Sequence, residues 1–255
     1  MLVIKFVMIL VYKRFGITPL QAINLLKEKR PELSSETLSY AGRLDPMAEG
    51  LLLILVGEEN KNRRHYEHFD KQYEFEALVG ISTDSYDLLG IPRTHGKIEF
   101  DQSKLNLFIE KNSSKIFQTY PPYSSIKVNG KPLYYWARKG VAVKTPKKEI
   151  NIKKFELLSV SEISARGLYE KITSSVSQIE GDFRQDEILE RWRLLMDSNT
   201  FEKFKVLKFC FVCTSGGYVR SLVNEMGEFL GTGAVTYSIK RTKIGDFDID
   251  SAVKI

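Results

Sequence analysis

A run of six apolar residues, LLLILV at 51–56, constrains the fold of this 255-residue chain more than any other feature. Uninterrupted apolar runs of this length are typical of strands buried on both faces, so we expect a core strand over 51–59. The run follows the segment SYAGRLDPMAEG, in which Arg43 and Asp45 flank a single leucine. Taken alone, an Asp-Pro pair most often starts a helix. Its place at the mouth of a buried strand also makes Asp45 a candidate functional carboxylate.

The remaining pattern alternates short helices with strands. Thr18 and Pro19 form a helix start, and Pro31 ends that helix. A second clear helix covers VRSLVNEMGEFLG and is closed by Gly231. Strands are expected over 71–80, in the apolar run KVLKFCFVC and near the end of the chain, with further helices over 60–71 and 101–113. The expected fold class is α+β, with a mixed, mostly antiparallel sheet, flanking helices and a central cleft.

The start of the chain, MLVIKFVMILVYKRFG, is apolar but does not have the form of an export signal. Lys5 interrupts the apolar run, and Lys13 and Arg14 follow it, whereas a signal peptide places its charge first. The run is too short to span a bilayer and is expected to form a strand. We therefore expect no membrane partner and a cytoplasmic protein.

The two cysteines, Cys210 and Cys213, have CxxC spacing but lie in an apolar run that predicts a strand. Residues three apart on a strand face opposite sides, and no second CxxC pair completes a set of four ligands. They are therefore expected to be buried thiols. The sequence contains no phosphate-binding loop, no Ser-His-Asp set and no metal-ligand cluster, so it predicts no metal site and no cofactor.

Basic residues are concentrated in the segment 118–150, where they are interleaved with tyrosine and tryptophan. Over the whole chain, lysine and arginine outnumber aspartate and glutamate by 38 to 32, a weak indication of a polyanionic partner. Cations neutralise phosphates, and exposed rings stack on unpaired bases. The competing interpretation is a surface hairpin whose aromatic side chains pack on their own body. The candidate RNA-binding residues are Lys127, Lys131, Arg138, Lys144, Lys147 and Lys148.

The segment 161–203 is polar and favours helix. Several of its apolar residues keep a roughly helical period, which predicts at least one amphipathic helix. These residues are Phe183, Ile188, Leu189, Trp192, Leu195 and Met196. The segment is either an inserted helical arm or a part of the core, and the pattern alone allows both.

Six blocks of the sequence, in the same order, resemble motifs of the tRNA pseudouridine-55 synthase (TruB) family. The segment GRLDP at 42–46, with Ala48, Gly50 and Leu51 behind it, resembles the family's G-x-L-D-P-x-A-x-G-L. The other blocks are KRFGIT at 13–18, DKQY at 70–73 with STDSYDLLG at 82–90, PPYSSIKVNGKPLYYWARKG at 121–140, SGGYVRSL at 215–222 and IKRTKIG at 239–245. The resemblance implies the pseudouridine synthase fold, with a central RNA-binding cleft, in a single catalytic domain over 1–255.

The resemblance also implies an activity and roles for several residues. Members of the family isomerise a uridine in the T-loop of tRNA, at position 55, to pseudouridine. The motif aspartate is their nucleophile, so that role falls on Asp45, and Arg220 matches the arginine that pairs with it. Tyr73 would stack on the flipped base and help to remove the proton from C5, while Tyr218 and Ile239 would line the same pocket. The implied partner is the T-arm of tRNA, with no cofactor and no obligate protein partner.

The segment 118–150 resembles the thumb with which the family grips the T-arm, and we call it the thumb. The segment 161–203 is longer than the hairpin usual at this place, and we call it the helical insertion. Tyr40 stands where the family usually has a histidine that helps to position the RNA, and Arg14 replaces a proline. Tyr40 and Arg43 are expected to contact substrate, and no C-terminal PUA domain is expected.

These departures leave two alternatives to an active enzyme. The first is an RNA-binding tRNA-folding factor whose catalysis is weak or lost. The second is a guide-RNA-dependent relative, although such relatives usually need the PUA region. The intact Asp45, Tyr73 and Arg220 favour the enzyme.

Overall fold

The computed structural model describes residues 7–95, 100–198 and 202–255. The part of the expected first strand at 1–6 lies outside the described residues. The main strands are β1 Met8–Lys13, β2 Leu38–Ala41, β3 Ala48–Val56, β4 Lys71–Val79, β7 Lys115–Thr119, β10 Lys147–Ser164, β11 Lys203–Cys213, β12 Ala234–Ile244, β13 Phe247–Asp248 and β14 Val253–Lys254. Two short hairpins pair β5 Ile81–Thr83 with β6 Pro92–Thr94, and β8 Lys127–Val128 with β9 Lys131–Pro132.

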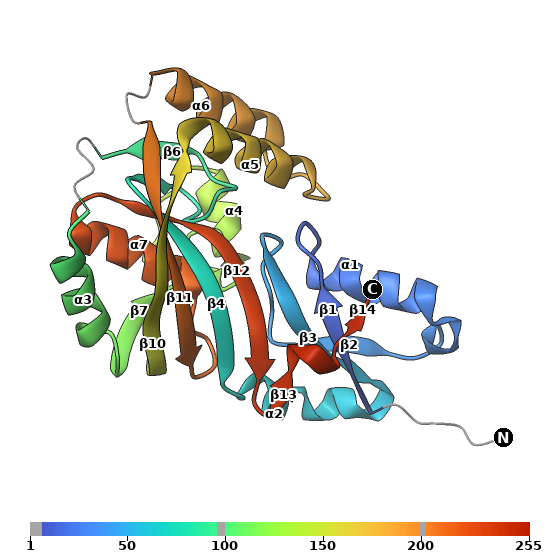
Figure 1. The fold of residues 1–255 in the computed structure, drawn as a ribbon. Coiled ribbons are helices and arrows are strands. Elements are labelled where there is room, and N and C mark those ends of the chain that lie inside the picture. The colour runs from blue at the N-terminus through green and yellow to red at the C-terminus, as the bar shows by residue number, and fades with distance from the viewer. Residues whose placement is uncertain (1–6, 96–99, 199–201) are drawn as a thin grey trace.

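In the described part of the chain, ten strands form one sheet (Figure 1). Their order is β14-β1-β3-β12-β4-β11-β10-β7, with β2 paired to β3 and β13 paired to β12. Neighbouring strands run antiparallel except in the pairs β1–β14 and β3–β12, which are parallel. The expected α+β class with a mixed, mostly antiparallel sheet is therefore confirmed.

The apolar run at 51–56 lies in β3, between β1 and β12. Alternate side chains of β3 enter two separate core clusters, Leu52 and Ile54 on one face and Leu51 and Leu53 on the other. The strand is buried on both faces, as predicted. The expectation that it continues to residue 59 is wrong, because Gly57 adopts a left-handed conformation (φ 59°) and begins a 3-10 helix.

Helices cover the sheet and confirm two of the predicted helix signals. Helix α1, Pro19–Lys29, begins with a complete capping box between Thr18 and Gln21. Helix α7, Val219–Leu230, ends at Gly231 in the left-handed conformation and packs on β4 beside α3, Gln102–Lys111 (Figure 1). The helix expected over 60–71 is shorter: α2 covers only Arg63–Glu67. None of the described helices is long and apolar enough to cross a bilayer.

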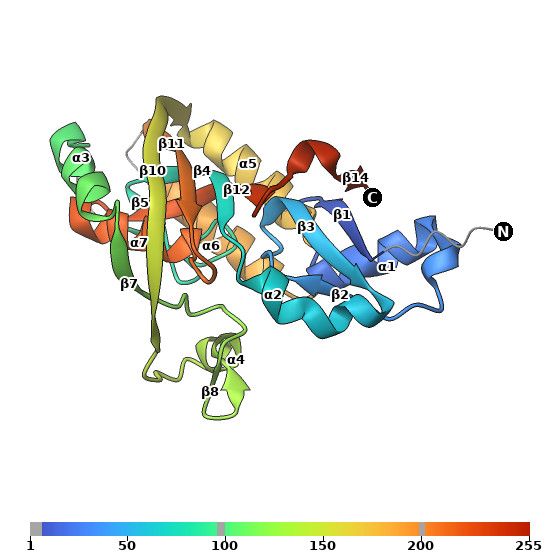
Figure 2. The same cartoon turned by 90° about the horizontal axis from the view of Figure 1, so that it is seen from below.

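The thumb connects β7 to β10, and the helical insertion connects β10 to β11. The thumb contains the β8–β9 hairpin and α4, Leu133–Arg138, and Figure 2 shows it projecting from the body. The helical insertion contains α5, Ala165–Ser177, and α6, Gln185–Ser198, which lie together at one end of the sheet (Figure 1). Its residues 199–201 lie outside the described residues. Both helices contribute to a core cluster with Leu78 of β4 and Val206 of β11, so the helical insertion is part of the core.

The two cysteines are free and buried on β11, as predicted. Burial raises the pKa of the Cys213 thiol to about 12, so this thiol is protonated at neutral pH. In the residues that the structure describes, no group of three His, Cys, Asp or Glu side chains converges as a possible metal site.

Candidate active site

Asp45 lies in the loop between β2 and β3, which is held by backbone hydrogen bonds. Gly16 N–H donates to the Pro46 carbonyl (2.9 Å), and Ala48 N–H donates to the Asp45 carbonyl (3.0 Å). The Asp45 side chain is 23% exposed, so the carboxylate is reachable although its backbone is fixed. We call residues 42–47 the nucleophile loop.

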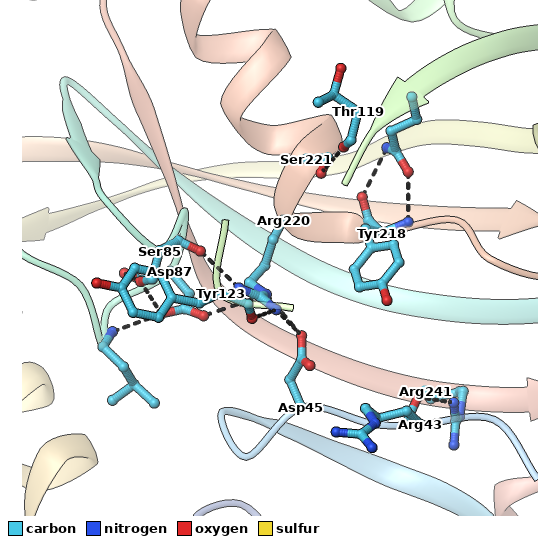
Figure 3. Close-up of polar contacts among 12 residues, drawn as sticks. Arg43, Asp45, Ser85, Asp87, Thr119, Tyr123, Tyr218, Arg220, Ser221 and Arg241 are labelled. Atoms are coloured by element: carbon cyan, nitrogen blue, oxygen red, sulfur yellow. Dashed lines mark hydrogen bonds and ion pairs between the residues drawn. The ribbon is translucent and has the colours of Figure 1, made fainter. Parts of the chain in front are cut away.

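Arg220 pairs with Asp45, as the sequence predicts. Arg220 is the second residue of α7, and its Nε and Nη2 lie 2.8 and 2.7 Å from Asp45 (Figure 3). Both contacts are to the same carboxylate oxygen, Oδ2, rather than one to each oxygen. The guanidinium therefore fixes the carboxylate through one oxygen and does not engage Oδ1, which remains available to a substrate.

Arg220 is itself held from its other side by the loop between β5 and β6 and by Tyr123 of the thumb (Figure 3). Its Nη1 donates to the Ser85 carbonyl (2.9 Å), its Nη2 donates to the Tyr123 carbonyl (3.1 Å), and its Nε lies 3.5 Å from the Asp87 carboxylate. The Arg220 side chain is only 3% exposed. Burial alone lowers the pKa of Arg220, but Asp45 and Asp87 more than offset this and raise it, so the cation persists.

Tyr218 and the start of α7 are tied to β7, at the base of the thumb. The Gln118 side chain receives a hydrogen bond from Tyr218 N–H (2.7 Å) and donates one to the Tyr218 carbonyl (2.9 Å). Ser221 Oγ donates to the Thr119 carbonyl (2.7 Å). The position of Arg220 is therefore fixed by α7, by β7 and by the β5–β6 loop together.

Two cavities open on Asp45, and both also contact Arg43, Tyr218 and Arg220. The first, of about 200 Å³, is lined by Tyr73 and Ile239, and we call it the Tyr73 cavity. The second, of about 360 Å³, extends between the thumb and the helical insertion, and we call it the thumb-side cavity. The structure thus brings six predicted site residues, far apart in sequence, to one cleft: Arg43, Asp45, Tyr73, Tyr218, Arg220 and Ile239.

Tyr73 is 9% exposed on β4, beside Arg241 of β12. Burial raises the pKa of the Tyr73 hydroxyl to about 12, while the nearby Arg241 cation acts in the opposite direction. Arg241 donates to the backbone carbonyls of Leu51 (2.8 Å), Arg43 (3.1 Å) and Gly42 (3.2 Å). It therefore links Tyr73 to the backbone of the nucleophile loop.

Comparison with known proteins decides the family. A profile of the TruB family pseudouridylate synthases (N-terminal domain) matches residues 30–181. The chain is 32% identical to the tRNA pseudouridine synthase B of Endomicrobium trichonymphae, over 97% of this chain and 88% of that protein. It is also 32% identical to the enzyme of the same name from Lactobacillus johnsonii, over 97% of this chain and 71% of that protein. The chain belongs to the TruB family.

The fold agrees with this assignment. A solved structure described as a Cbf5-Nop10-Gar1 complex superposes with a TM-score of 0.59 and 18% identity, covering 97% of this chain and 52% of that chain. A second, an H/ACA RNP bound to a substrate RNA containing 2'-deoxyuridine, gives a TM-score of 0.56 at 16% identity, covering 97% of this chain and 50% of that chain. The fold class expected from the sequence is confirmed.

Tyr40, a predicted substrate contact, does not line either cavity. Its hydroxyl accepts a hydrogen bond from Arg43 Nη2 (3.1 Å), and the Arg63 guanidinium lies 5.4 Å from its ring centre. Its body packs against the core cluster under α1. Tyr40 therefore reaches the cleft only through Arg43.

The predicted RNA-binding residues of this TruB family member lie in different surroundings. Lys127, Lys131, Lys144 and Lys147 are exposed. Lys148 is half-buried against Gly216, which lines the Tyr73 cavity. A Cβ at Gly216 would overlap the Lys148 ammonium group. The Arg138 guanidinium contacts Asp182 of the helical insertion. Five of the six therefore remain open to a phosphate, and the sixth, Arg138, is exposed but donates to the Asp182 backbone carbonyl (2.5 Å) and lies 3.5 Å from its carboxylate.

Three further residues organise the cleft and were not predicted as site residues from the sequence: Asp87, Tyr123 and Arg241. All three lie within the matched motif blocks, at STDSYD, PPYSS and IKRT. For Asp87 and Arg241 the available signal was a charge within a matched motif block, because a charge that is buried needs a partner. No comparable signal marked Tyr123.

Proposed function

We propose that this chain is a tRNA pseudouridine synthase that converts a T-loop uridine, at position 55, to pseudouridine. The observation that carries the proposal is the Asp45 carboxylate, fixed through Oδ2 by Arg220, at a cavity lined by Tyr73 and Ile239. A carboxylate nucleophile has to be accessible and immobile, and this arrangement satisfies both conditions.

The reaction is an isomerisation that balances without a co-reactant. The N1–C1′ bond of uridine breaks, the uracil turns, and a new bond joins C1′ to C5. The proton lost from C5 is matched by a proton gained at N1. Asp45 attacks either C6 of the ring or C1′ of the sugar, and the C–O bond that it forms breaks again before the product leaves. Arg220 stabilises the carboxylate before the attack and when it is released.

Tyr73 is proposed to stack on the flipped uracil and to assist removal of the C5 proton. Because the pKa of its hydroxyl is raised to about 12, the phenol is neutral at neutral pH. Tyr73 therefore passes the C5 proton on and is not a phenolate before the reaction begins. The Arg241 cation stabilises negative charge that develops on the Tyr73 oxygen. Tyr218, Ile239 and Arg43 complete the wall around the nucleoside, and Tyr40 supports Arg43.

The target atoms are stacked within the RNA, so the nucleotide has to be flipped into the cleft. The thumb is proposed to hold the T-arm while this occurs. Its exposed cations, Lys127, Lys131, Lys144 and Lys147, meet phosphates, and Lys148 lies beside the Tyr73 cavity. Tyr134, a residue that is 45% exposed, offers a ring on which a base can stack.

The proposal treats 1–255 as one catalytic domain that carries the thumb at 118–150 and the helical insertion at 161–203. It is tested with purified protein and an unmodified tRNA transcript. Pseudouridine is mapped by carbodiimide treatment and primer extension, and a matched transcript carries cytidine at the target position. We expect one stop, at the T-loop uridine, that is absent from the cytidine transcript. No stop at any uridine, together with faster refolding of the transcript, would favour the folding factor.

A further inference from the structure

The loop between α5 and α6 of the helical insertion reaches the catalytic cleft. We call residues 178–184 the insertion loop. Asp182, Phe183 and Arg184 line the thumb-side cavity, which also contains Asp45 and Arg220. The helical insertion is therefore a wall of the same cavity as the nucleophile, although it is not among the motif blocks that resemble the family.

Arg184 makes the most specific contact of the insertion loop. Its Nη1 and Nη2 donate to the two oxygens of the Asp84 carboxylate, at 3.0 and 3.3 Å. Its guanidinium carbon lies 4.7 Å from the centre of the Tyr123 ring, and the Tyr123 hydroxyl donates to the same carboxylate (3.1 Å). A two-point ion pair combined with stacking holds both partners in one orientation.

The backbone of Arg184 has a positive φ of 63°. This conformation is costly for a residue other than glycine, and it persists only where surrounding contacts impose it. The contacts with Asp84 and Tyr123 supply that constraint. The backbone outlier thus occurs at a residue that lines the thumb-side cavity.

The β5–β6 loop, residues 84–91, connects the helical insertion to Arg220. Its Ser85 carbonyl and Asp87 carboxylate bind the Arg220 guanidinium directly. The helical insertion holds this loop at both ends, because Arg184 binds Asp84 and the Trp192 indole N–H donates to the Gly90 carbonyl (3.2 Å). The Arg220 contacts lie between these two points.

The insertion loop also contacts Gly16, which in turn binds the nucleophile loop. Glu180 N–H donates to the Gly16 carbonyl (3.1 Å), and Gly16 N–H donates to the Pro46 carbonyl, next to Asp45. A Cβ at Gly16 would overlap the Gln178 carbonyl, so the close approach requires glycine there. The helical insertion therefore contacts Gly16, which binds the loop of Asp45, and the β5–β6 loop, which binds Arg220.

We propose that Arg184 is a positioning residue for the reaction: it acts through Asp84 and the β5–β6 loop to hold Arg220 against Asp45. This inference rests on the proposed function, because its effect is expressed in the rate of uridine isomerisation. Arg184 does not touch the reacting atoms. Misplacement of a catalytic group by about 1 Å costs on the order of 100-fold in rate, so a loosened Arg220 has a measurable effect.

The test compares Arg184→Ala with Arg193→Ala, a control on the same insertion whose guanidinium pairs with Glu190 and Asp197 of its own helix. Single-turnover rates are measured at saturating tRNA transcript, and tRNA Kd is measured separately. For Arg184→Ala we expect the rate to fall by about 10- to 100-fold with Kd within about threefold of wild type. Arg193→Ala is expected to match wild type in both quantities.

Two further measurements separate positioning from other roles. Asp84→Asn should reduce the rate comparably, and the double variant should lose no more than the stronger single variant, because the two residues act in one path. Amide hydrogen exchange over residues 84–91 should accelerate in Arg184→Ala and not in Arg193→Ala.

The possible outcomes are distinct. A raised Kd with an unchanged rate would make Arg184 an RNA contact and overturn the proposal, as would an unchanged rate with unchanged exchange. If wild-type protein makes no pseudouridine, the proposed function fails, and the exchange experiment alone then decides whether Arg184 holds the β5–β6 loop.

Discussion

The thumb and the helical insertion are both additions beside β10, yet they differ in how they are attached. Between β7 and β10 the thumb buries Pro121, Ser124 and Leu133, and its hairpin and helix extend into solvent (Figure 2). The helical insertion buries a full apolar face against the sheet. That face consists of Leu168, Ile172, Val176, Ile188 and Trp192.

This difference separates two tasks within one cleft. Buried apolar area makes an element rigid, whereas exposed charge with little core leaves it free to adapt to a partner. We infer that the exposed hairpin and helix of the thumb are suited to meeting RNA, while the helical insertion, together with the base of the thumb at 118–123, is suited to holding the catalytic groups still. The chain has one tryptophan in each region, which allows the comparison to be tested directly.

The largest expected effect concerns stability. Trp192 is fully buried, and Trp192→Ala should lower the free energy of unfolding by about 3–5 kcal/mol. Trp136 of the thumb is half-buried and donates to the Val128 carbonyl (2.9 Å), so Trp136→Ala should cost only about 1 kcal/mol. Urea unfolding followed by circular dichroism measures both. An equal or larger loss for Trp136→Ala would contradict the distinction between the regions.

The second effect concerns the pH dependence of stability. In contrast to the exposed thumb lysines, Lys13 is fully buried and donates to the carbonyls of Ile17 and Arg14. Burial lowers the pKa of Lys13 to about 7. Between pH 7 and 9 the unfolded chain therefore binds a proton that the native state does not, so stability rises with pH. We expect a rise of about 1 kcal/mol per pH unit from this group, lost in Lys13→Met. Unfolding curves at pH 7, 8 and 9 test this, and equal slopes in both proteins would refute it.

The smallest effect concerns RNA affinity. Replacing Lys144, Lys147 and Lys148 by alanine should weaken tRNA binding roughly tenfold and reduce the slope of log K against log salt by about 2. The control replaces three exposed cations of the helical insertion, Arg166, Arg191 and Arg193, and should leave the slope nearly unchanged. Filter binding over a range of salt concentrations measures both. If the control loses as much as the thumb variant, the division of tasks is wrong.

Local signals predicted much of the fold and part of the site. The helix start at Thr18 and Pro19, the helix end at Gly231 and the strand over 51–56 are determined by neighbouring residues, and all are confirmed. The pair Asp45–Arg220 was predicted from motif resemblance rather than from spacing. The structure confirms that pair and adds that a single carboxylate oxygen receives both contacts.

Other features depend on tertiary contacts that no local pattern specifies. Arg184 and Asp84 are 100 residues apart, and their pairing follows only from how α5 and α6 pack on the sheet. The same packing decided that the helical insertion is core rather than arm. That Tyr40 contacts substrate stays a prediction: its ring packs against the core cluster under α1, and its hydroxyl bonds Arg43, which lines both cavities.

The central claim is that the Asp45 carboxylate performs the chemistry while the rest of the cleft binds and positions. Asp45→Asn keeps the shape of the side chain and removes its charge, so it tests this claim most directly. At saturating tRNA transcript we expect no single-turnover product above background, with Kd within about fivefold of wild type. Product formation by Asp45→Asn at a rate within about tenfold of wild type would contradict the account.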